Sequence, residues 1–158
     1  RYLGKMTDII LHHGGTIDEF LGDAVLAAFG APSVSADHAT KAVNCAIQMQ
    51  EAMAEINAEN IADGLPIIEM AIALNTGEVV AGNIGSERRS KYGFVGHQVN
   101  LTSRIEDDAR PHEILISEQT YRALNGDHFV AGESRTIKAK GIEELLTVYP
   151  IVGSTSNA

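Results

Sequence analysis

Residues 16–30, TIDEFLGDAVLAAFG, constrain the fold of this chain more than any other segment. Two short apolar runs in this segment are separated at Gly22 and Asp23, and that pattern is typical of a β-hairpin. Residues 128–152, near the end of the chain, predict a second hairpin. Because a hairpin pairs its two strands antiparallel, these segments favour a mixed α+β sheet over a doubly wound parallel one.

Between the hairpins, the hydrophobic pattern changes repeatedly from the period of a helix to that of a strand. Helices are predicted for residues 2–13, 37–56, 97–109 and 118–125, and strands for 67–74, for two parts of 75–96 and for 113–117. Asp37 is the predicted N-cap of the long second helix, and residues 57–66 are predicted to be a polar loop. With one further strand, expected before Arg1 in the native protein, this order gives a ferredoxin-like βαββαβ core with extra C-terminal strands and helices. Residues 1–158 are therefore interpreted as a single domain without its first strand.

The composition argues against several classes of protein. A formal net charge of −9, from 12 Lys and Arg against 21 Asp and Glu, disfavours nucleic acid as a partner. No apolar run reaches the length of a membrane span, and the single cysteine, Cys45, cannot form an internal disulfide. These features favour the cytoplasm, a reducing compartment. The sequence contains neither a P-loop nor a dinucleotide-binding glycine motif.

Three short groups of polar residues remain as candidates for a site. Asp23 is a ligand type that hard cations such as Mg²⁺ prefer, although Gly-Asp is also ordinary turn chemistry. Asn100 and Arg104 fall on one face of the helix predicted for residues 97–109. That face suits a sugar hydroxyl and a phosphate, or else is an ordinary solvated surface. Lys140, which precedes a glycine in the last hairpin, indicates little alone.

Several segments together resemble the class III nucleotidyl cyclases, the adenylyl and guanylyl cyclase family, and most of all a bacterial guanylyl cyclase of the cyanobacterial kind. The segments are HGGTIDEFLGDAVLAAFGAP, DHATKAVNCAIQMQ, LNTGEVVAGNIGSERRSKYGFVGHQVNLTSRIE, EILIS and KGIEELLTVY. They run nearly end to end in the order of the family. The resemblance implies a phosphorus–oxygen lyase that converts a nucleoside triphosphate into a cyclic nucleotide and pyrophosphate.

The resemblance gives each candidate residue a role. Asp23 matches the second of two metal-binding aspartates, which together hold two divalent ions, Mg²⁺ or Mn²⁺. Asn100 matches the residue that orients the ribose, and Arg104 matches the one that stabilises charge on the reacting α-phosphate. Lys140 matches the lysine that holds the triphosphate. The ribose 3′-oxygen attacks the α-phosphorus and pyrophosphate leaves, with no general base evident in the sequence.

Glu19 predicts which nucleotide is used. Members of the family that use ATP usually carry Lys at this position, where it donates to a ring nitrogen of adenine. Guanine instead presents two donors, N1–H and the exocyclic amino group, and a carboxylate accepts from both. Gly93, at the second purine-reading position, has no side chain that accepts from the amino group of adenine. The resemblance therefore implies a guanylyl cyclase that makes 3′,5′-cyclic GMP from GTP.

The resemblance also implies a C2 homodimer, because the active sites of the family lie between two chains. Asp23 then serves one site, and the other five candidates serve the second. The sequence departs from the family in two places besides Gly93: the first metal aspartate is expected upstream of Arg1, and His97 replaces the usual Asp. Regulatory sensor domains are expected on the same native chain.

Three other interpretations stay open. The domain is an adenylyl cyclase that makes cyclic AMP from ATP, or a degenerate cyclase homologue that binds nucleotide without turnover, or a ferredoxin-like binding module. The presence of all four residues matched to metal, ribose and phosphate disfavours the degenerate homologue, because decay usually removes such groups first.

Overall fold

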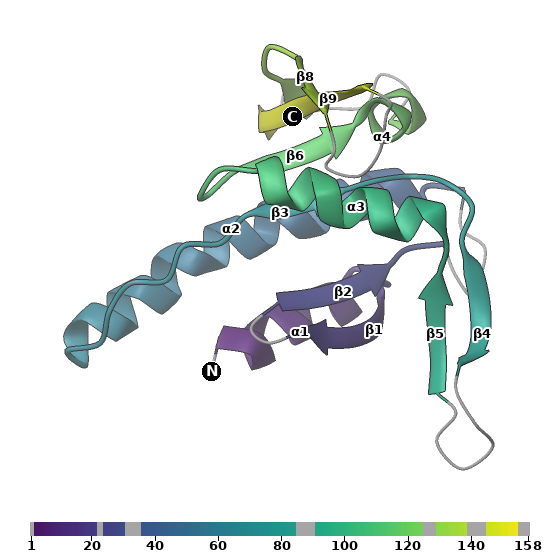
Figure 1. Cartoon of the computed structure of the whole chain (residues 1–158). Coiled ribbons are helices and arrows are strands. Elements are labelled where there is room, and N and C mark those ends of the chain that lie inside the picture. The colour runs from purple at the N-terminus through teal and green to yellow at the C-terminus, as the bar shows by residue number, and fades with distance from the viewer. Residues whose placement is uncertain are drawn as a thin grey trace.

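The computed structural model describes residues 2–21, 24–30, 36–84, 91–124, 129–138 and 145–154. Figure 1 shows a mixed α+β architecture, as predicted. The described helices are α1 (Tyr2–His12), α2 (His38–Ala62), α3 (His97–Asp108) and α4 (Glu118–Ala123). The described strands are β1 (Thr16–Leu21), β2 (Ala24–Ala28), β3 (Ile72–Leu74), β4 (Val80–Ile84), β5 (Lys91–Val95), β6 (Ile114–Ser117), β7 (Phe129–Ala131), β8 (Arg135–Lys138) and β9 (Leu145–Ser154).

The strands form two hairpins and a larger sheet. Strands β1 and β2 pair antiparallel, which confirms the first predicted hairpin, and β4 pairs with β5 in the same way. In the larger sheet, β3 runs parallel to β6, and the long strand β9 pairs antiparallel with β6, β7 and β8. The pairing of β8 with β9 is the second predicted hairpin. The strand expected before Arg1 stays a prediction.

Three apolar clusters hold these elements together. In the first, Met6 and Ile10 of α1 pack against Met53 and Ile56 of α2. In the second, the N-terminal half of α2 covers β6, with Val43 fully buried. The third joins α3 to β6 and β9, so α3 lies over the larger sheet (Figure 1). No helix within the described ranges is both long and apolar enough to cross a lipid bilayer.

The loop predicted for residues 57–66 begins later than expected: α2 continues to Ala62, and only residues 63–66 of that range lie outside helices and strands. The helix turns Asn57 inward, where its side-chain Nδ2 donates to the Ile68 carbonyl at 3.0 Å and its Oδ1 accepts from the Ile68 amide at 2.8 Å. Because both groups of its side-chain amide have backbone partners, Asn57 stabilises the helix here, although a polar residue at this position predicts a loop.

A glycine ends this helix. The amide of Leu65 donates to the carbonyl of Asn60 at 2.7 Å, and that of Gly64 donates to Ile61 at 3.1 Å, which is the bond pattern of a Schellman cap. The cap needs a left-handed backbone, and Gly64 has a φ of 75°. At the other end, α2 begins directly after Asp37 as predicted, but the Asp37 side chain makes no capping hydrogen bond.

The strand predicted for residues 67–74 is shorter than expected, since only β3 lies in a ladder. The Met70 carbonyl instead accepts from Gln50 Nε2 of α2 at 2.9 Å and from the His112 amide at 2.8 Å. These bonds tie the chain before β3 to a helix and to a turn. In residues 67–74, the alternation of apolar residues therefore indicates which side chains are buried, but not which residues pair in a sheet.

A cluster of charged residues, Arg135, Asp108 and Glu113, joins β8 to the end of α3 and the start of β6. The two terminal nitrogens of Arg135 donate to both carboxylate oxygens of Glu113, at 2.9 and 2.8 Å. Arg135 Nε donates to Asp108 Oδ2 at 3.1 Å, and Nη2 donates to the Asp108 carbonyl at 3.1 Å. Within this Arg135 cluster, only 23% of the Arg135 side chain and 14% of that of Glu113 are exposed, so water screens this pair poorly, whereas Asp108 is 42% exposed.

The Arg135 cluster also closes a tight turn before β6. The amide of Glu113 donates to the Arg110 carbonyl at 2.9 Å, and the Arg110 amide donates to Glu113 Oε1 at 2.9 Å. Between them, Pro111 is followed by His112 with a φ of 67°, an unfavourable conformation for a residue other than glycine. The carboxylate of Glu113 therefore stabilises a turn that the backbone alone disfavours.

We predict that this carboxylate makes the fold sensitive to acid. The hydrogen bond from Arg135 lowers the pKa of Glu113 below its usual 4.5, so the folded state binds fewer protons than the unfolded state. This contribution to the free energy of unfolding is complete above the usual pKa and is lost as the pH falls through the lowered one. Urea unfolding between pH 7 and pH 3 should show the loss in the native chain and not in Glu113→Gln.

The matched control for this prediction is Glu118→Gln, which removes a carboxylate from an exposed pair with Arg122 on α4. Exposed pairs contribute little, so this variant should keep the pH dependence of the native chain. An identical pH dependence in Glu113→Gln and the native chain would contradict the prediction.

Candidate active site

Glu19 lies on β1, where the strand is irregular. Ile17 pairs with Ala27 and Glu19 with Leu26 on β2, so Asp18 is an extra residue in the ladder, as in a β-bulge. The Glu19 side chain is half-buried. A bulge redirects the side chains beside it, and such irregularities are frequent next to binding sites.

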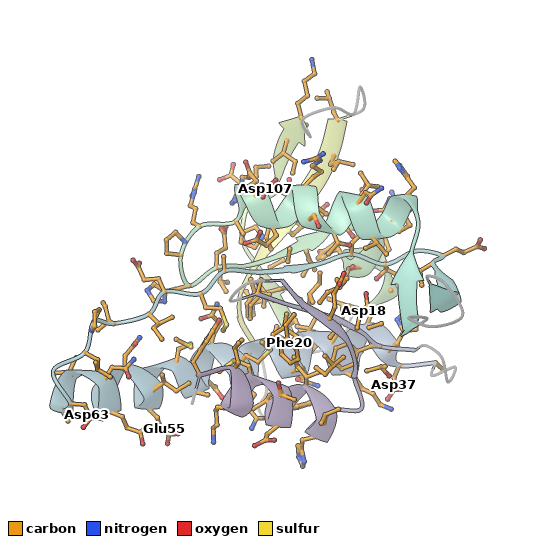
Figure 2. All side chains as sticks on the ribbon, turned by 60° about the horizontal axis from the view of Figure 1, so that its bottom comes forward. Asp18, Phe20, Asp37, Glu55, Asp63 and Asp107 are labelled. Atoms are coloured by element: carbon orange, nitrogen blue, oxygen red, sulfur yellow. The ribbon has the colours of Figure 1, made fainter. Side chains whose placement is uncertain are left out.

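Asp18, which the sequence analysis did not single out, places a second acceptor in this part of β1. Its Oδ1 is buried and has no hydrogen-bond partner among the residues that the structure describes. Figure 2 labels Asp18 and Phe20, which precede and follow Glu19 in the sequence. The only sequence signal was an acidic residue directly before Glu19 in a strand that is otherwise largely apolar.

Gly93 lies on β5 opposite Gly82 of β4. This rung of the hairpin therefore carries no side chain on either strand. Strand β1 contacts β5, so the two predicted purine-reading residues, Glu19 and Gly93, lie on neighbouring strands.

Asn100 and Arg104 lie on the exposed face of α3, in agreement with the predicted helix. Leu101 and Ile105 of the same helix are buried, and Ile105 packs against β6 and β9 of the sheet. The Arg104 side chain is 43% exposed, and its Nη1 lies 3.9 Å from Asp107 Oδ2, which is a loose contact. An amide and a guanidinium one turn apart can contact adjacent parts of one ligand.

The first turn of α3 is attached to the chain after β3 through Gln98. Asn75 Nδ2 donates to the Gln98 carbonyl at 3.0 Å and to its side-chain Oε1 at 2.9 Å. Thr102 Oγ1 donates to the same carbonyl at 2.8 Å. A Cβ atom at Gly77 would overlap the Gln98 side chain, so the backbone must approach closely there. Asn75 and Gln98 were not predicted as site residues; the NTG motif after a strand was a signal for Asn75 alone.

Asp23 and Lys140, predicted to hold metal and triphosphate, lie outside the described residues. Within the described ranges, no three side chains of His, Cys, Asp or Glu come together as a metal site. The structure places Glu19, Gly93 and the α3 pair on elements that contact one another, since β5 contacts both β1 and α3. The roles of Asp23 and Lys140 stay predictions.

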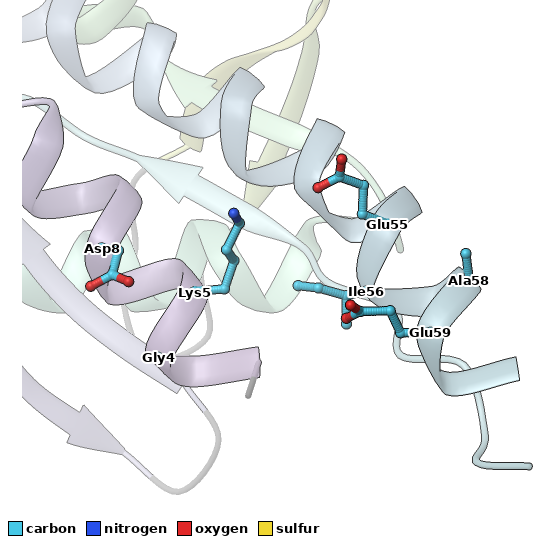
Figure 3. A pocket seen from close by; sticks show the side chains of 7 residues that line it. All are labelled: Gly4, Lys5, Asp8, Glu55, Ile56, Ala58 and Glu59. Atoms are coloured by element: carbon cyan, nitrogen blue, oxygen red, sulfur yellow. The ribbon is translucent and has the colours of Figure 1, made fainter. Parts of the chain in front are cut away.

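A surface hollow of about 670 Å³ lies between α1 and the C-terminal half of α2 (Figure 3). It is lined by Gly4, Lys5, Asp8, Glu55, Ile56, Ala58 and Glu59. None of the predicted site residues is among these, and three of the four charged side chains are acidic. The hollow is therefore not suited to a triphosphate.

Cys45 is not a candidate nucleophile. It is buried in the cluster that joins α1 and α2, and burial raises the pKa of its thiol to about 12. Its Sγ lies 3.8 Å from Met49 Sδ. A thiol with this pKa stays protonated at neutral pH, so its role is packing.

Comparison with known proteins identifies the class to which this fold and site belong. The profile of the adenylate and guanylate cyclase catalytic domain matches residues 3–153. The chain belongs to this family, the class III nucleotidyl cyclases, as predicted from its motifs.

Two solved structures and one curated relative illustrate the likeness. The guanylyl cyclase Cya2 is 47% identical, with a TM-score of 0.89 over 97% of this chain and 77% of that one. The adenylyl cyclase CyaB from P. aeruginosa is 35% identical, with a TM-score of 0.90 over 99% of this chain and 81% of that one. Adenylate cyclase 1 of Rhizobium meliloti (strain 1021) is 31% identical over 96% of this chain but only 23% of its own length. Both substrate classes are thus represented among the relatives.

We predict that Gly77→Ala loosens the first turn of α3. The added methyl group displaces the Gln98 side chain, which then loses its hydrogen bond from Asn75. A lost hydrogen bond of this kind lowers the free energy of unfolding by about 1 kcal/mol. Hydrogen exchange of the α3 amides should quicken together with a fall in the unfolding midpoint.

Gly4→Ala is the matched control, because a Cβ atom at Gly4 in α1 meets nothing within 4 Å. Alanine is the better helix former, so this variant should gain stability, by up to about 1 kcal/mol. Equal effects of the two substitutions on stability would contradict the prediction.

Proposed function

We propose that this domain is a guanylyl cyclase, which converts GTP into 3′,5′-cyclic GMP and pyrophosphate. The observation that supports it most is the half-buried Glu19 on β1, beside the strand that carries Gly93. A half-buried carboxylate accepts the N1–H and amino donors of guanine, whereas adenine presents an acceptor at its N1. The glycine leaves the ring of the purine unobstructed.

The proposed chemistry is a displacement at the α-phosphorus. A bond forms between the ribose 3′-oxygen and this phosphorus as the bond to the β-phosphate oxygen breaks, and the 3′-hydroxyl gives up its proton. Asn100 is proposed to orient the ribose, and Arg104 to meet the charge that grows on the α-phosphate. Lys140 is proposed to hold the triphosphate. The exposed face of α3 keeps the first two side chains accessible.

Divalent metal ions belong to the chemistry of this family. Two ions, Mg²⁺ or Mn²⁺, would supply positive charge for the phosphates and a lower pKa for the 3′-hydroxyl. From the match of Asp23 to a metal-binding aspartate of the family, we propose that Asp23 binds them together with an aspartate expected before Arg1. Carboxylate oxygens are the ligands that these hard cations prefer.

The proposed assembly is a homodimer with two equivalent sites. Asp23 of one chain and the nucleotide-binding residues of the other would complete each site, so that a single chain has none. This arrangement explains how Glu19 and Asp23 take different tasks although only three residues separate them. Sensor domains elsewhere on the native chain and a location in the cytoplasm belong to the same proposal.

An adenylyl cyclase is the second candidate. The likeness to CyaB, an adenylyl cyclase with a TM-score of 0.90 to this chain, supports it. Against it stands Glu19, an acceptor where adenine also presents an acceptor.

The first prediction from this proposal concerns the choice of nucleotide. The native protein, assayed with GTP and with ATP separately, should form cyclic GMP in preference to cyclic AMP. Glu19→Lys should lower the use of GTP by orders of magnitude, because two guanine donors then face a donor. Any gain of ATP use should be partial, since Gly93 supplies no acceptor side chain.

Glu51→Lys on the exposed face of α2 controls for the change of charge alone and should keep GTP turnover. Equal GTP turnover in the native protein and in Glu19→Lys would remove the selector role. Preferential formation of cyclic AMP by the native protein would favour the second candidate.

The second prediction concerns the shared site. Asp23→Ala and Arg104→Ala chains should each be nearly inactive as homodimers. After mixing and exchange, half of the dimers contain one intact site, so about a quarter of the native activity should return. Failure of the mixture to regain activity, with exchange shown by mass spectrometry, would mean that each chain builds its own site.

A further inference from the structure

The exposed face of α3 carries one more residue in register with the candidate pair. Asn100, Arg104 and Asp108 follow each other at intervals of four, so their side chains lie in one row along the helix. Asp108 is thus a neighbour of Arg104 on the helix surface. An aspartate four residues from an arginine is a natural ion-pair partner.

The C-terminal end of α3 is unusually acidic. Glu106, Asp107 and Asp108 occupy its last turn, which contains no basic residue. The C-terminus of a helix carries partial negative charge, so acidic side chains are unfavourable there. A nearby cation would offset this charge, and the nearest one on the helix itself is Arg104.

Arg104 is nevertheless only loosely engaged by these acids. Its contact with Asp107 spans 3.9 Å between two side chains that are 43% and 67% exposed. Such an exposed pair is weak and is easily exchanged for a phosphate. Figure 2 labels Asp107 at this end of α3.

Asp108 does not compete for Arg104 because the Asp108 carboxylate is bonded to Arg135. Arg135 Nε donates to Asp108 Oδ2 at 3.1 Å, and Arg135 also bonds the Asp108 carbonyl, which is one of the last of the helix. Two further bonds to Glu113 fix the plane of the same guanidinium. The cation that α3 needs at its end is thus supplied by β8.

We propose that Arg135 is a positioning residue: by holding Asp108, it keeps this carboxylate from pairing with Arg104 and leaves the Arg104 guanidinium available to an anionic ligand. This inference rests on the proposed function, in which that ligand is the α-phosphate of the nucleotide. Without Arg135, Asp107 and Asp108 would both face Arg104 from the same helical turn. A phosphate would then have to displace two carboxylates instead of one loose contact.

Two substitutions of Arg135 test this inference. Arg135→Ala releases both carboxylates. Arg135→Lys keeps a cation near Glu113 but lacks the planar fork that reaches Asp108 as well. Both variants should lower turnover with GTP by about tenfold, less than the roughly 10²–10³-fold expected for loss of a donor to the reacting phosphate itself. If the alanine variant does not fold, the lysine variant provides the test.

Second substitutions separate this role from mere stabilisation. Asp108→Asn, added to either Arg135 variant, should restore most of the turnover, because the competing charge is gone. Glu113→Gln is the matched control: it weakens the same cluster but leaves Asp108 bonded to Arg135, so turnover should stay close to native while the melting temperature falls. Turnover that falls with the melting temperature in Glu113→Gln, with no rescue by Asp108→Asn, would overturn the proposal.

A measurement that does not depend on catalysis tests the positioning role of Arg135 separately from the proposed cyclase activity. The NMR signal of the Arg104 Nε–H group reports whether its guanidinium rotates freely. Rotation should slow in Arg135→Ala or Arg135→Lys and recover when Asp108→Asn is added. If the native protein makes neither cyclic nucleotide, the proposed function fails. The positioning role is then still tested by the rotation of the Arg104 guanidinium in the Arg135 variants: slowed rotation would support it, and unchanged rotation would overturn it.

Discussion

Directional hydrogen bonds fix α3 at both ends, and the candidate site depends on where this helix lies. At the N-terminal end, the neutral amide of Asn75 holds both oxygens of Gln98. At the C-terminal end, the charged Arg135 bonds Asp108 and Glu113. Apolar packing of the buried face presses the helix onto the sheet, but such packing has no direction along the helix axis. The polar bonds are directional, so they set the position of the exposed face.

Local patterns in the sequence were sufficient for much of the fold. The hairpin of β1 and β2 was predicted because its two apolar runs and its turn residues lie within one segment. The end of α2 and the start of β3 were not, because Asn57 and Gln50 bond backbone groups 11 and 20 residues further along. Periodicity reports which residues are buried, but not which polar groups find distant partners. Gly64 was the one local signal that could have located the end of α2.

In the candidate site, too, some residues were predicted from the sequence and others were not. Glu19, Asn100 and Arg104 were named from the resemblance of whole motifs to a family, since their types and spacing alone fit an ordinary surface as well. The residues that support them were missed, because Asn75 and Gln98 are 23 residues apart and Arg135 and Asp108 are 27 apart. A short motif shows the side chains that meet a ligand. The side chains that hold them in place become visible only when the chain is folded.

A helix that is fixed at both ends also fixes the distance between the side chains that it carries. Asn100 and Arg104 are four residues apart, so the rise of the helix separates them by about 6 Å along its axis, whatever their neighbours are. One inserted residue between them would turn the second side chain by about 100°. Substitutions on the exposed face can therefore accumulate in related chains, whereas the number of residues between the two anchors cannot change without separating the two groups from their common ligand.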